Sequence, residues 1–409
     1  MRRIFIFLLI SILLLLRFSL STRRSVFQNG EVYNMLLDVN ESKATILKIN
    51  NKYPINNIYA RLFYKEDGRY NGYFIVKKLR QEDSFSFMEL KEIKSEKMKG
   101  NFINTYLSNI FERASEDFSP SLKNMNKALF LGENFLSKKT KEKIRYLGLS
   151  HIFAMSGLHI GIVFFIIYFI CFKIFESKFI IEITSLFFLS LYYLGVKESP
   201  SFTRAYIMIV IYLFGKLLYE KISPEKALFA SGIISIFIKP NTVFSLSFQL
   251  SYLAMLAIIY FYPFIKKLNI KKWKTLDYIF FTLSIQIFLI PIQIFYFNSL
   301  PFLSILLNIL ILPFVSFYIT VLYLHLFLEN FYLSFILSPL VGLNYKIFEK
   351  IINFCSKIPN MSIYFYNKNS IYFYLVFFLL VFIIKNSMFK KSMKNKTVCV
   401  ILEASKMEV

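Results

Sequence analysis

Cysteine, histidine, tryptophan and acidic residues are all scarce in this sequence of 409 residues. It has three cysteines, three histidines and one tryptophan, and its 25 Asp and Glu stand against 49 Lys and Arg. No cysteine lies between residues 21 and 150, so disulfides cannot stabilise that region. The sequence also contains no CxxC, HExxH, GxGxxG or GxxxxGKS/T motif. We therefore expect no metal site, no cofactor and no ATP-driven motor in this chain.

Hydrophobic residues, by contrast, are abundant. They make up 56% of the chain, and its mean hydropathy is +0.52, which is typical of an integral membrane protein. The net charge of +24 suits an anionic partner, either nucleic acid or the acidic headgroups of membrane lipids. A lysine-rich composition is also what an AT-rich genome encodes, so the charge alone does not select DNA.

The first apolar segment, residues 4–16, follows Arg2 and Arg3 directly. No small-residue cleavage site comes after it, and Arg17 follows at once, which argues against a cleaved signal peptide. We therefore expect residues 1–20 to form an uncleaved transmembrane anchor.

The next part of the chain alternates between apolar and polar side chains, which is the period of β-strands. With glycine-containing turn signals at Gly68 and Gly72, the pattern predicts a five-stranded domain at residues 21–98. The predicted strands cover residues 32–39, 43–50, 57–65, 73–80 and 84–91. This number and length suit a small barrel of the OB type, and a plain antiparallel sheet is the alternative.

Residues 99–150 are expected to form amphipathic and linker helices. An apolar stripe at helical spacing marks the first helix, over residues 101–118. The stripe consists of Phe102, Ile103, Tyr106, Leu107, Ile110 and Phe111. This helix is expected either to pack on the β-domain or to lie in the membrane interface.

Residues 151–385 are predicted to form an α-helical transmembrane domain with nine spans, so that the anchor makes about ten. The predicted spans cover residues 152–171, 179–196, 202–219, 227–242, 243–263, 277–297, 302–325, 330–345 and 370–385. An amphipathic helix over residues 344–359 is expected to lie on the outer surface. Lysines gather in alternate loops and in the tail, residues 386–409, which the positive-inside rule assigns to the cytoplasm. Both termini are then cytoplasmic, and residues 21–150 are extracytoplasmic.

The segment HIFAMSGLHIG brings two histidines and a serine to the start of the membrane domain. If the segment is one α-helix, His151 and His159 lie near one face, and Gly157 and Gly161 let another backbone approach. Ionisable groups at membrane depth are costly and therefore point to a function. In the alternative interpretation the glycines serve helix packing, and polar groups such as Ser156 only bond neighbouring helices.

Later predicted spans carry further polar side chains at helical spacing, namely Gln249, Gln286, Gln293 and Asn308. These amides either line a channel or form hydrogen bonds between helices. The segment SPSFTRA is expected to begin a helix at Pro200 and to place Arg204 one turn in. The Arg204 side chain either serves the channel or extends to the outer interface.

Basic residues and tyrosines are interleaved on the predicted strands of the β-domain. The pattern is typical of a surface that neutralises phosphates and stacks the bases of single-stranded DNA. It equally fits the solvent face of a strand from a chain rich in Lys and Tyr. The candidate DNA-binding residues are Arg61, Lys77, Lys78, Arg80, Tyr59 and Tyr73, with Tyr70 between them.

Five segments, in this order, resemble the membrane domain of the ComEC competence-protein family. They are ALFLGENF (128–135), LSHIFAMSGLHIGIV (149–163), SPSFTRAYIM (199–208), FSLSFQLSYLAM (244–255) and PIQIFYFNSLPFLSILLNILILPFV (291–315). The resemblance is strong over residues 125–320 and extends to the anchor and the OB-like module. It implies an inner-membrane channel that admits single-stranded DNA during natural transformation.

The resemblance also implies partners, and the sequence departs from the family in two ways. A separate DNA receptor and a cytoplasmic helicase or ATPase motor are expected, and the oligomeric state is open, a homo-oligomer included. Larger family members carry a C-terminal metallo-β-lactamase-like domain, whereas here a lysine-rich tail follows residue 385 and no HxHxDH ligand set occurs. Many relatives have a disulfide in the OB-like module, which this sequence cannot form.

Two functions of other classes fit the sequence less closely. One is a permease, or a transporter of another polymer or of lipid, that reuses the same membrane fold. The other is an enzyme in which Ser156 and either His159 or His151 act as nucleophile and base. No acidic residue in the motif orients these histidines. We therefore expect a channel subunit and not an enzyme.

Overall fold

The computed structural model describes the greater part of the chain, in two compact units. The described residues are 22–23, 27–40, 43–54, 57–62, 68–81, 85–97, 101–133, 136–266, 273–297, 299–358 and 362–364. The first unit comprises Met1–Lys141, Ser150–Gln249 and Val315–Glu349, and the second comprises Glu142–Leu149, Leu250–Phe314 and Lys350–Val409. The predicted anchor, the predicted span at 370–385 and the tail lie outside the described residues.

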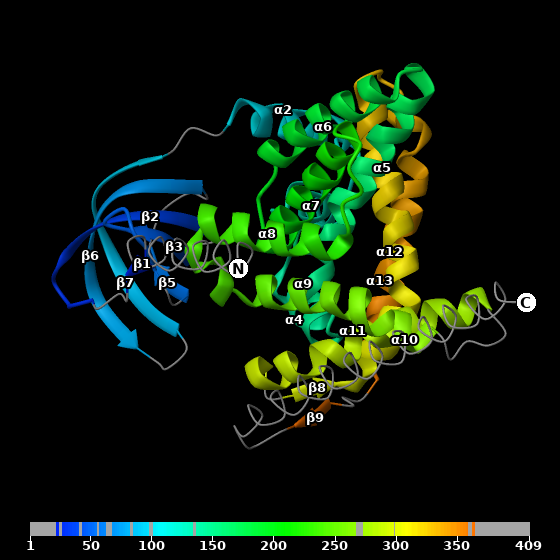
Figure 1. Cartoon of the computed structure of the whole chain (residues 1–409). Coiled ribbons are helices and arrows are strands. Elements are labelled where there is room, and N and C mark those ends of the chain that lie inside the picture. Colours follow the sequence, from blue (N-terminus) through cyan, green and yellow to red (C-terminus); the bar gives the residue numbers. More distant parts are fainter. Residues whose placement is uncertain are drawn as a thin grey trace, which may run out of the picture. The chain divides into compact units, whose positions relative to one another are not determined.

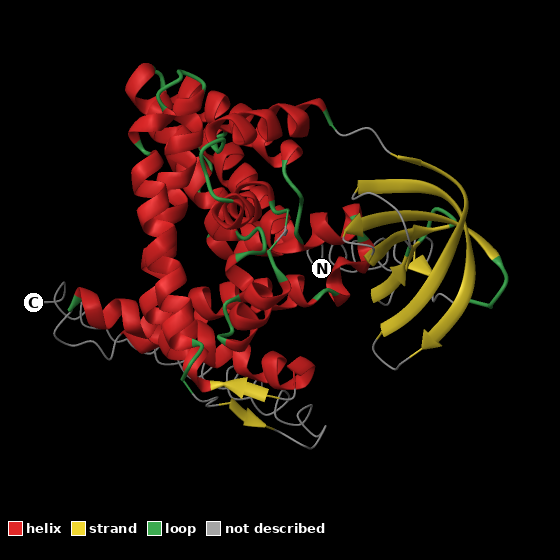
Figure 2. Ribbon diagram, turned by 180° about the vertical axis from the view of Figure 1, so that it is seen from behind, coloured by secondary structure: helices red, strands yellow, loops and turns green. Residues whose placement is uncertain are grey.

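A closed five-stranded barrel opens the first unit (Figures 1 and 2). Its strands are β2 (Val32–Asn40), β3 (Lys43–Ile49), β5 (Asn57–Arg61), β6 (Gly68–Gln81) and β7 (Phe85–Lys97), in the order β2-β3-β5-β7-β6. The barrel closes because β6 also pairs with β2. Strands β5 and β7 run parallel, and the other pairs are antiparallel. The alternative of a plain antiparallel sheet is therefore wrong.

Alternate residues of these strands fill the barrel core, as the period of two predicts. The buried side chains include Met35, Leu37, Ala44, Ile46, Ile58, Ala60, Phe74, Val76, Met88 and Leu90. The predicted turn at Gly72 is wrong, because this glycine lies inside β6. A Cβ there would overlap the Lys94 carbonyl of β7, so the close approach of the two strands requires glycine. A bulge between Val76 and Lys78 then interrupts the alternation.

Two short strands, β1 (Thr22–Arg23) and β4 (Tyr53–Pro54), form a separate parallel pair. The helices of the first unit follow the barrel. They are α2 (Phe102–Ala114), α3 (Pro120–Leu131), α5 (Gly157–Ile174), α6 (Lys178–Gly195), α7 (Pro200–Leu217) and α8 (Pro224–Ile238). Helices α3, α7 and α8 each begin with a serine cap followed by proline. The N–H groups of a first turn have no intrahelical acceptor, so the serine hydroxyl satisfies one of them and proline has none to satisfy.

The remaining elements complete both units. They are α4 (Lys138–Tyr146), η1 (Ser150–Ile152), η2 (Pro240–Phe244), α9 (Leu246–Leu256), the π-helical η3 (Ala257–Phe261), α10 (Tyr262–Lys266), α11 (Lys274–Phe297), β8 (Ser299–Pro301), α12 (Phe302–Glu329), η4 (Ser334–Ile336), α13 (Ser338–Cys355) and β9 (Ser362–Tyr364). In the second unit, the Tyr278 hydroxyl donates to the Ile309 carbonyl at 3.1 Å and so joins α11 to α12.

Four helical segments among the described residues are long and apolar enough to cross a membrane. They are Ser150–Ile174, Lys178–Gly195, Lys274–Tyr296 and Ile305–Glu329, and Leu246–Phe261 is a shorter apolar helix. The total of about ten spans stays a prediction. The predicted boundary at residue 344 is wrong, because α13 runs without a break from Ser338 to Cys355. Residues 330–337 form turns and η4 instead of the first part of a span.

Candidate functional site

Three segments that lie far apart in the sequence meet before the start of α5. A Cβ on Gly132, at the end of α3, would lie 2.6 Å from Met155 Cγ and 3.1 Å from the Lys197 carbonyl. Its φ of +74° also favours glycine. The Lys197 amide donates to the Leu131 carbonyl at 2.9 Å, and the Ser199 hydroxyl donates to the Met155 carbonyl. These contacts join the ends of α3 and the starts of α5 and α7.

Helix α5 begins at Gly157, so the prediction of one helix from His151 to Gly161 is wrong. Ser156 is extended (φ −131°, ψ 174°), and its amide donates to His159 Nδ1 at 3.3 Å. Ser156 Oγ lies 2.9 Å from the same nitrogen. The arrangement is a capping box in which histidine replaces the usual Glu or Gln, and it fixes the helix start.

The two histidines of the motif consequently lie in different surroundings. His151 is exposed in the 3₁₀ turn η1, whereas His159 is buried with 1% of its surface exposed. They do not share a helix face. Because His159 Nδ1 accepts the Ser156 amide, the neutral ring carries its proton on Nε2. Among the described residues this buried Nε2 has no hydrogen-bond partner.

Gly157 and Gly161 likewise lie in different surroundings. A Cβ on Gly157 would lie 3.3 Å from Arg204 Nη2 and 3.4 Å from Ala205 Cβ, so Gly157 packs against side chains of α7, and the approach of another backbone there stays a prediction. At Gly161 the prediction of a close contact is wrong. No described atom outside the local α5 backbone and Gly161's chain neighbours lies within 4 Å of a Cβ built there, and the residue is half-buried.

Pro200 and Arg204 occupy the positions predicted for them on α7. The Ser199 hydroxyl caps the helix by accepting the Phe202 amide at 3.1 Å, and Pro200 is the first helical residue. Arg204 is 7% exposed and lies beside Gly157, so extension of its side chain to the protein surface is wrong. The structure thus brings Ser156, Gly157 and Arg204 together.

Two tyrosines that sequence reasoning missed hold the end of α3 in this region. The Tyr192 hydroxyl of α6 donates to the Phe130 carbonyl at 2.8 Å, and the Tyr323 hydroxyl of α12 donates to the Leu129 carbonyl at 3.1 Å. These carbonyls belong to the last turn of α3, where the helix offers no N–H. In the sequence, a tyrosine inside an apolar span was the one feature that indicated such a contact, because a buried tyrosine hydroxyl usually has a hydrogen-bond partner.

The predicted amides are divided between the two units. Gln249 Nε2 donates to the Val243 carbonyl of η2 at 3.1 Å, which is a local bond. Gln286 and Asn308 are buried in the second unit, and Gln293 of that unit is half-buried.

On the barrel, outward positions carry most of the candidate DNA-binding residues. Tyr59 and Arg61 are exposed on β5, on either side of the buried Ala60, and Tyr73 is exposed on β6. Tyr70 is in the core and is therefore not available for stacking. The side chain of Arg80 lies outside the described part of the structure.

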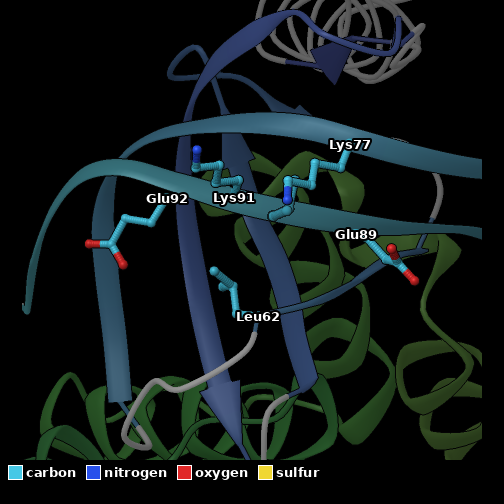
Figure 3. A pocket seen from close by; sticks show the side chains of 6 residues that line it. Leu62, Lys77, Glu89, Lys91 and Glu92 are labelled. Carbon is cyan, nitrogen blue, oxygen red and sulfur yellow. The ribbon is translucent and has the colours of Figure 1, made fainter.

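Lys77 and Lys78 are both exposed on β6, but acidic residues of β7 accompany them. Lys78 pairs across the strands with Glu89. Lys77 borders a hollow of about 250 Å³ whose lining is Leu62, Lys77, Glu89, Leu90, Lys91 and Glu92 (Figure 3). Residues 27–97 hold twelve Lys and Arg against ten Asp and Glu, so the barrel is nearly neutral in a chain of +24.

A protein-family model described as Competence protein matches residues 129–389, which is more than half of the chain. The chain belongs to the competence protein family. The matched region of this competence-family protein contains nearly all of the three segments that meet before α5, and the barrel precedes it.

Two relatives align with part of this competence-family protein. ComE operon protein 3 of Bacillus subtilis (strain 168) is 27% identical over 191 residues, which cover 46% of this chain and 24% of the relative. An uncharacterized protein of Aquifex aeolicus (strain VF5) is 26% identical over 203 residues, which cover 46% of this chain and 48% of the relative. The alignments thus span about a quarter and about half of the relatives' lengths. No solved structure matches the chain.

Proposed function

We propose that this protein is a channel subunit that admits single-stranded DNA across the cytoplasmic (inner) membrane during natural transformation. Membership of the competence protein family, four helices suited to crossing a membrane and the name of the Bacillus subtilis relative support a role in DNA uptake. The alternation of lysines between loops supports cytoplasmic termini and an extracytoplasmic barrel.

One observation carries the proposal. Arg204 is buried beside Gly157, and one turn further along α5 no described atom outside the local α5 backbone and the chain neighbours lies within 4 Å of a Cβ built on Gly161. A guanidinium keeps its charge at every physiological pH, and burying it is unfavourable unless anionic or polar groups compensate. A fixed cation one turn of α5 away from this uncrowded position suits the passage of a phosphate backbone. The Ser156–His159 pair acts as the helix cap of this site, and we infer no catalytic role for it.

The barrel supports the same function through its topology. With its five strands numbered along the chain, the order β2-β3-β5-β7-β6 is one-two-three-five-four, and the third and fifth strands pair in parallel. We infer an OB-type module, a fold whose second and third strands bind oligonucleotides. In this barrel those strands are β3 and β5, where Tyr59 and Arg61 face outward. We favour this face over Lys77 and Lys78 because acidic side chains accompany the two lysines.

The proposal requires partners that supply what the chain lacks. A separate receptor delivers the DNA, and a cytoplasmic helicase or ATPase motor pulls it. The nearly balanced charge of the barrel is the observation that favours the second candidate function, a permease or a transporter of another polymer or of lipid. Binding of single-stranded DNA to the β3–β5 face separates the two functions.

Replacement of Arg204 tests the proposed function. In a strain whose chromosomal copy is deleted, Arg204→Lys keeps the cation and is expected to retain much of the transformation frequency. Arg204→Gln removes the charge and is expected to lower transformation at least tenfold, which is about 1.4 kcal/mol in a barrier. Both variants are first shown to accumulate in the membrane as the wild type does. Wild-type transformation by a normally accumulating Arg204→Gln variant would contradict the proposal.

A further inference from the structure

Helix α2 lies across the end of α6, one of the candidate spans (Figure 1). Asn101 Nδ2 donates to the Leu194 carbonyl at 3.2 Å, and Asn104 Nδ2 donates to the Gly195 carbonyl at 2.6 Å. Both carbonyls belong to the last turn of α6, where no intrahelical donor remains. A Cβ on Gly195 would lie 2.5 Å from Leu107 Cδ1, so the two helices are in close contact.

Helix α2 also contacts the end of α12, a second candidate span. The Tyr106 hydroxyl donates to Asn330 Oδ1 at 3.2 Å, directly after α12 ends at Glu329. Arg113 Nε lies 3.6 Å from the Glu329 carboxylate. His325 Nε2 lies 2.9 Å from the Ala114 carbonyl at the last residue of α2. Helix α2 therefore runs across the ends of two helices that are suited to crossing a membrane.

Only part of the apolar stripe of α2 is buried. Ile110 and Phe111 are buried, whereas Phe102 is 82% exposed and Tyr106 is exposed as well. The turn after α12 adds further exposed apolar side chains, and Tyr332 there is 77% exposed. We call this set the aromatic patch: Phe102, Tyr106, Phe331, Tyr332, Phe335 and Ile336.

We propose that α2 lies in the membrane–water interface and that the aromatic patch enters the boundary between lipid headgroups and acyl chains. The patch lies at the ends of α6 and α12, which is the depth at which aromatic side chains anchor a protein to the interface. Helix α6 itself carries exposed apolar side chains, among them Phe187, Phe188 and Leu194, and the Leu194 carbonyl accepts from Asn101 directly before Phe102. A lipid surface therefore suits the patch better than water. The alternative that the experiment must distinguish from lipid is a second copy of the chain that covers the patch.

Tryptophan fluorescence in proteoliposomes tests this placement. Trp273 is the one tryptophan of the sequence, and Trp273→Phe gives a silent background. Phe102→Trp and Phe335→Trp then report on the patch, and Tyr73→Trp on the outer face of the barrel is the matched control. The vesicles contain phosphatidylcholine and phosphatidylglycerol, with a nitroxide lipid labelled either near the headgroup or at the end of the acyl chain.

The two patch variants are expected to be quenched most strongly by the nitroxide near the headgroup. Aqueous iodide is expected to quench them about threefold less than Tyr73→Trp, because interfacial side chains are partly withdrawn from water. Iodide quenching equal to that of Tyr73→Trp would place the patch in water and overturn the proposal. Protection from both quenchers would mean that protein covers the patch and would also overturn it. If Phe102→Trp fails to fold, Phe335→Trp still reports on the aromatic patch.

Discussion

The barrel and the helical region around the start of α5 bury different kinds of side chain. Every buried side chain in the described part of the five barrel strands is hydrophobic, with Phe74 and Met35 at its centre. The helical region buries His159 and Arg204. Polar burial lowers stability unless each group is bonded, whereas apolar burial stabilises directly. The barrel therefore gains stability from apolar burial alone, whereas the start of α5 also buries an ionisable histidine and a charged arginine.

The largest expected effect is a loss of stability in the barrel. Phe74→Ala removes a fully buried ring and is expected to cost about 3–5 kcal/mol, because the cavity fills only partly. Hydrogen exchange of the whole protein in nanodiscs should show lost protection in β2, β6 and β7. Amides of α5 and α7 should keep theirs. Equal loss in both regions would show that barrel and helices unfold as one.

A smaller effect tests whether the serine cap of α5 serves only the stability of the helix or also DNA uptake. Ser156→Ala removes the cap of α5, and Ser223→Ala removes the cap of α8, where the Ser223 hydroxyl accepts the Lys226 amide at 3.4 Å. Each is expected to lower stability by about 1 kcal/mol. Only Ser156→Ala is expected to reduce transformation as well, because it removes the hydroxyl that lies 2.9 Å from His159 Nδ1 and leaves the ring held by the amide of residue 156 alone. Equal transformation by the two variants would make the α5 cap purely structural.

The smallest effect concerns Glu112 on α2, outside the candidate spans. Partial burial alone would raise the pKa of this carboxyl, but the hydrogen bond from Lys123 and the charge of Lys127 outweigh it and lower the pKa. A lowered pKa in the folded state means that the stabilisation is present above the unfolded carboxyl's pKa and is lost as pH falls through the folded one.

The carboxylate is nearly half-exposed, so solvent screens the pair and its contribution is at most about 1 kcal/mol. Glu112→Gln should make the melting temperature less dependent on pH between about 5 and 3, given the ordinary range of a carboxyl pKa. Unchanged acid sensitivity in this variant would assign the effect to other carboxylates.

Local patterns in the sequence predicted the barrel well and the α5 site only in part. Alternation located five strands, but the bulge after Val76 and the interior Gly72 concealed how far β6 extends. The parallel pairing of β5 and β7 brings together residues that no local period relates.

At the α5 site, residue types identified the right segment, and the serine-proline start of α7 was predicted correctly. The contact of Gly132 with Met155 and the bonds of Tyr192 and Tyr323 to α3 join residues far apart in the chain, and no spacing rule reveals them. The expected helix from His151 was wrong because a histidine completed the capping box at Ser156.

The measurement that tests the central claim most directly compares two glycines one turn apart. Gly157→Leu would bring its Cβ to 3.3 Å from Arg204 Nη2 and 3.4 Å from Ala205 Cβ and add three further carbons, so it is expected to lower the amount of folded protein in the membrane. Gly161→Leu meets no described atom outside the local α5 backbone within 4 Å at its Cβ, so the protein is expected to accumulate normally. If DNA passes along α5 at this position, Gly161→Leu should lower uptake of labelled DNA at least tenfold, about 1.4 kcal/mol. Normal accumulation together with normal uptake would contradict the claim that the start of α5 lines the passage.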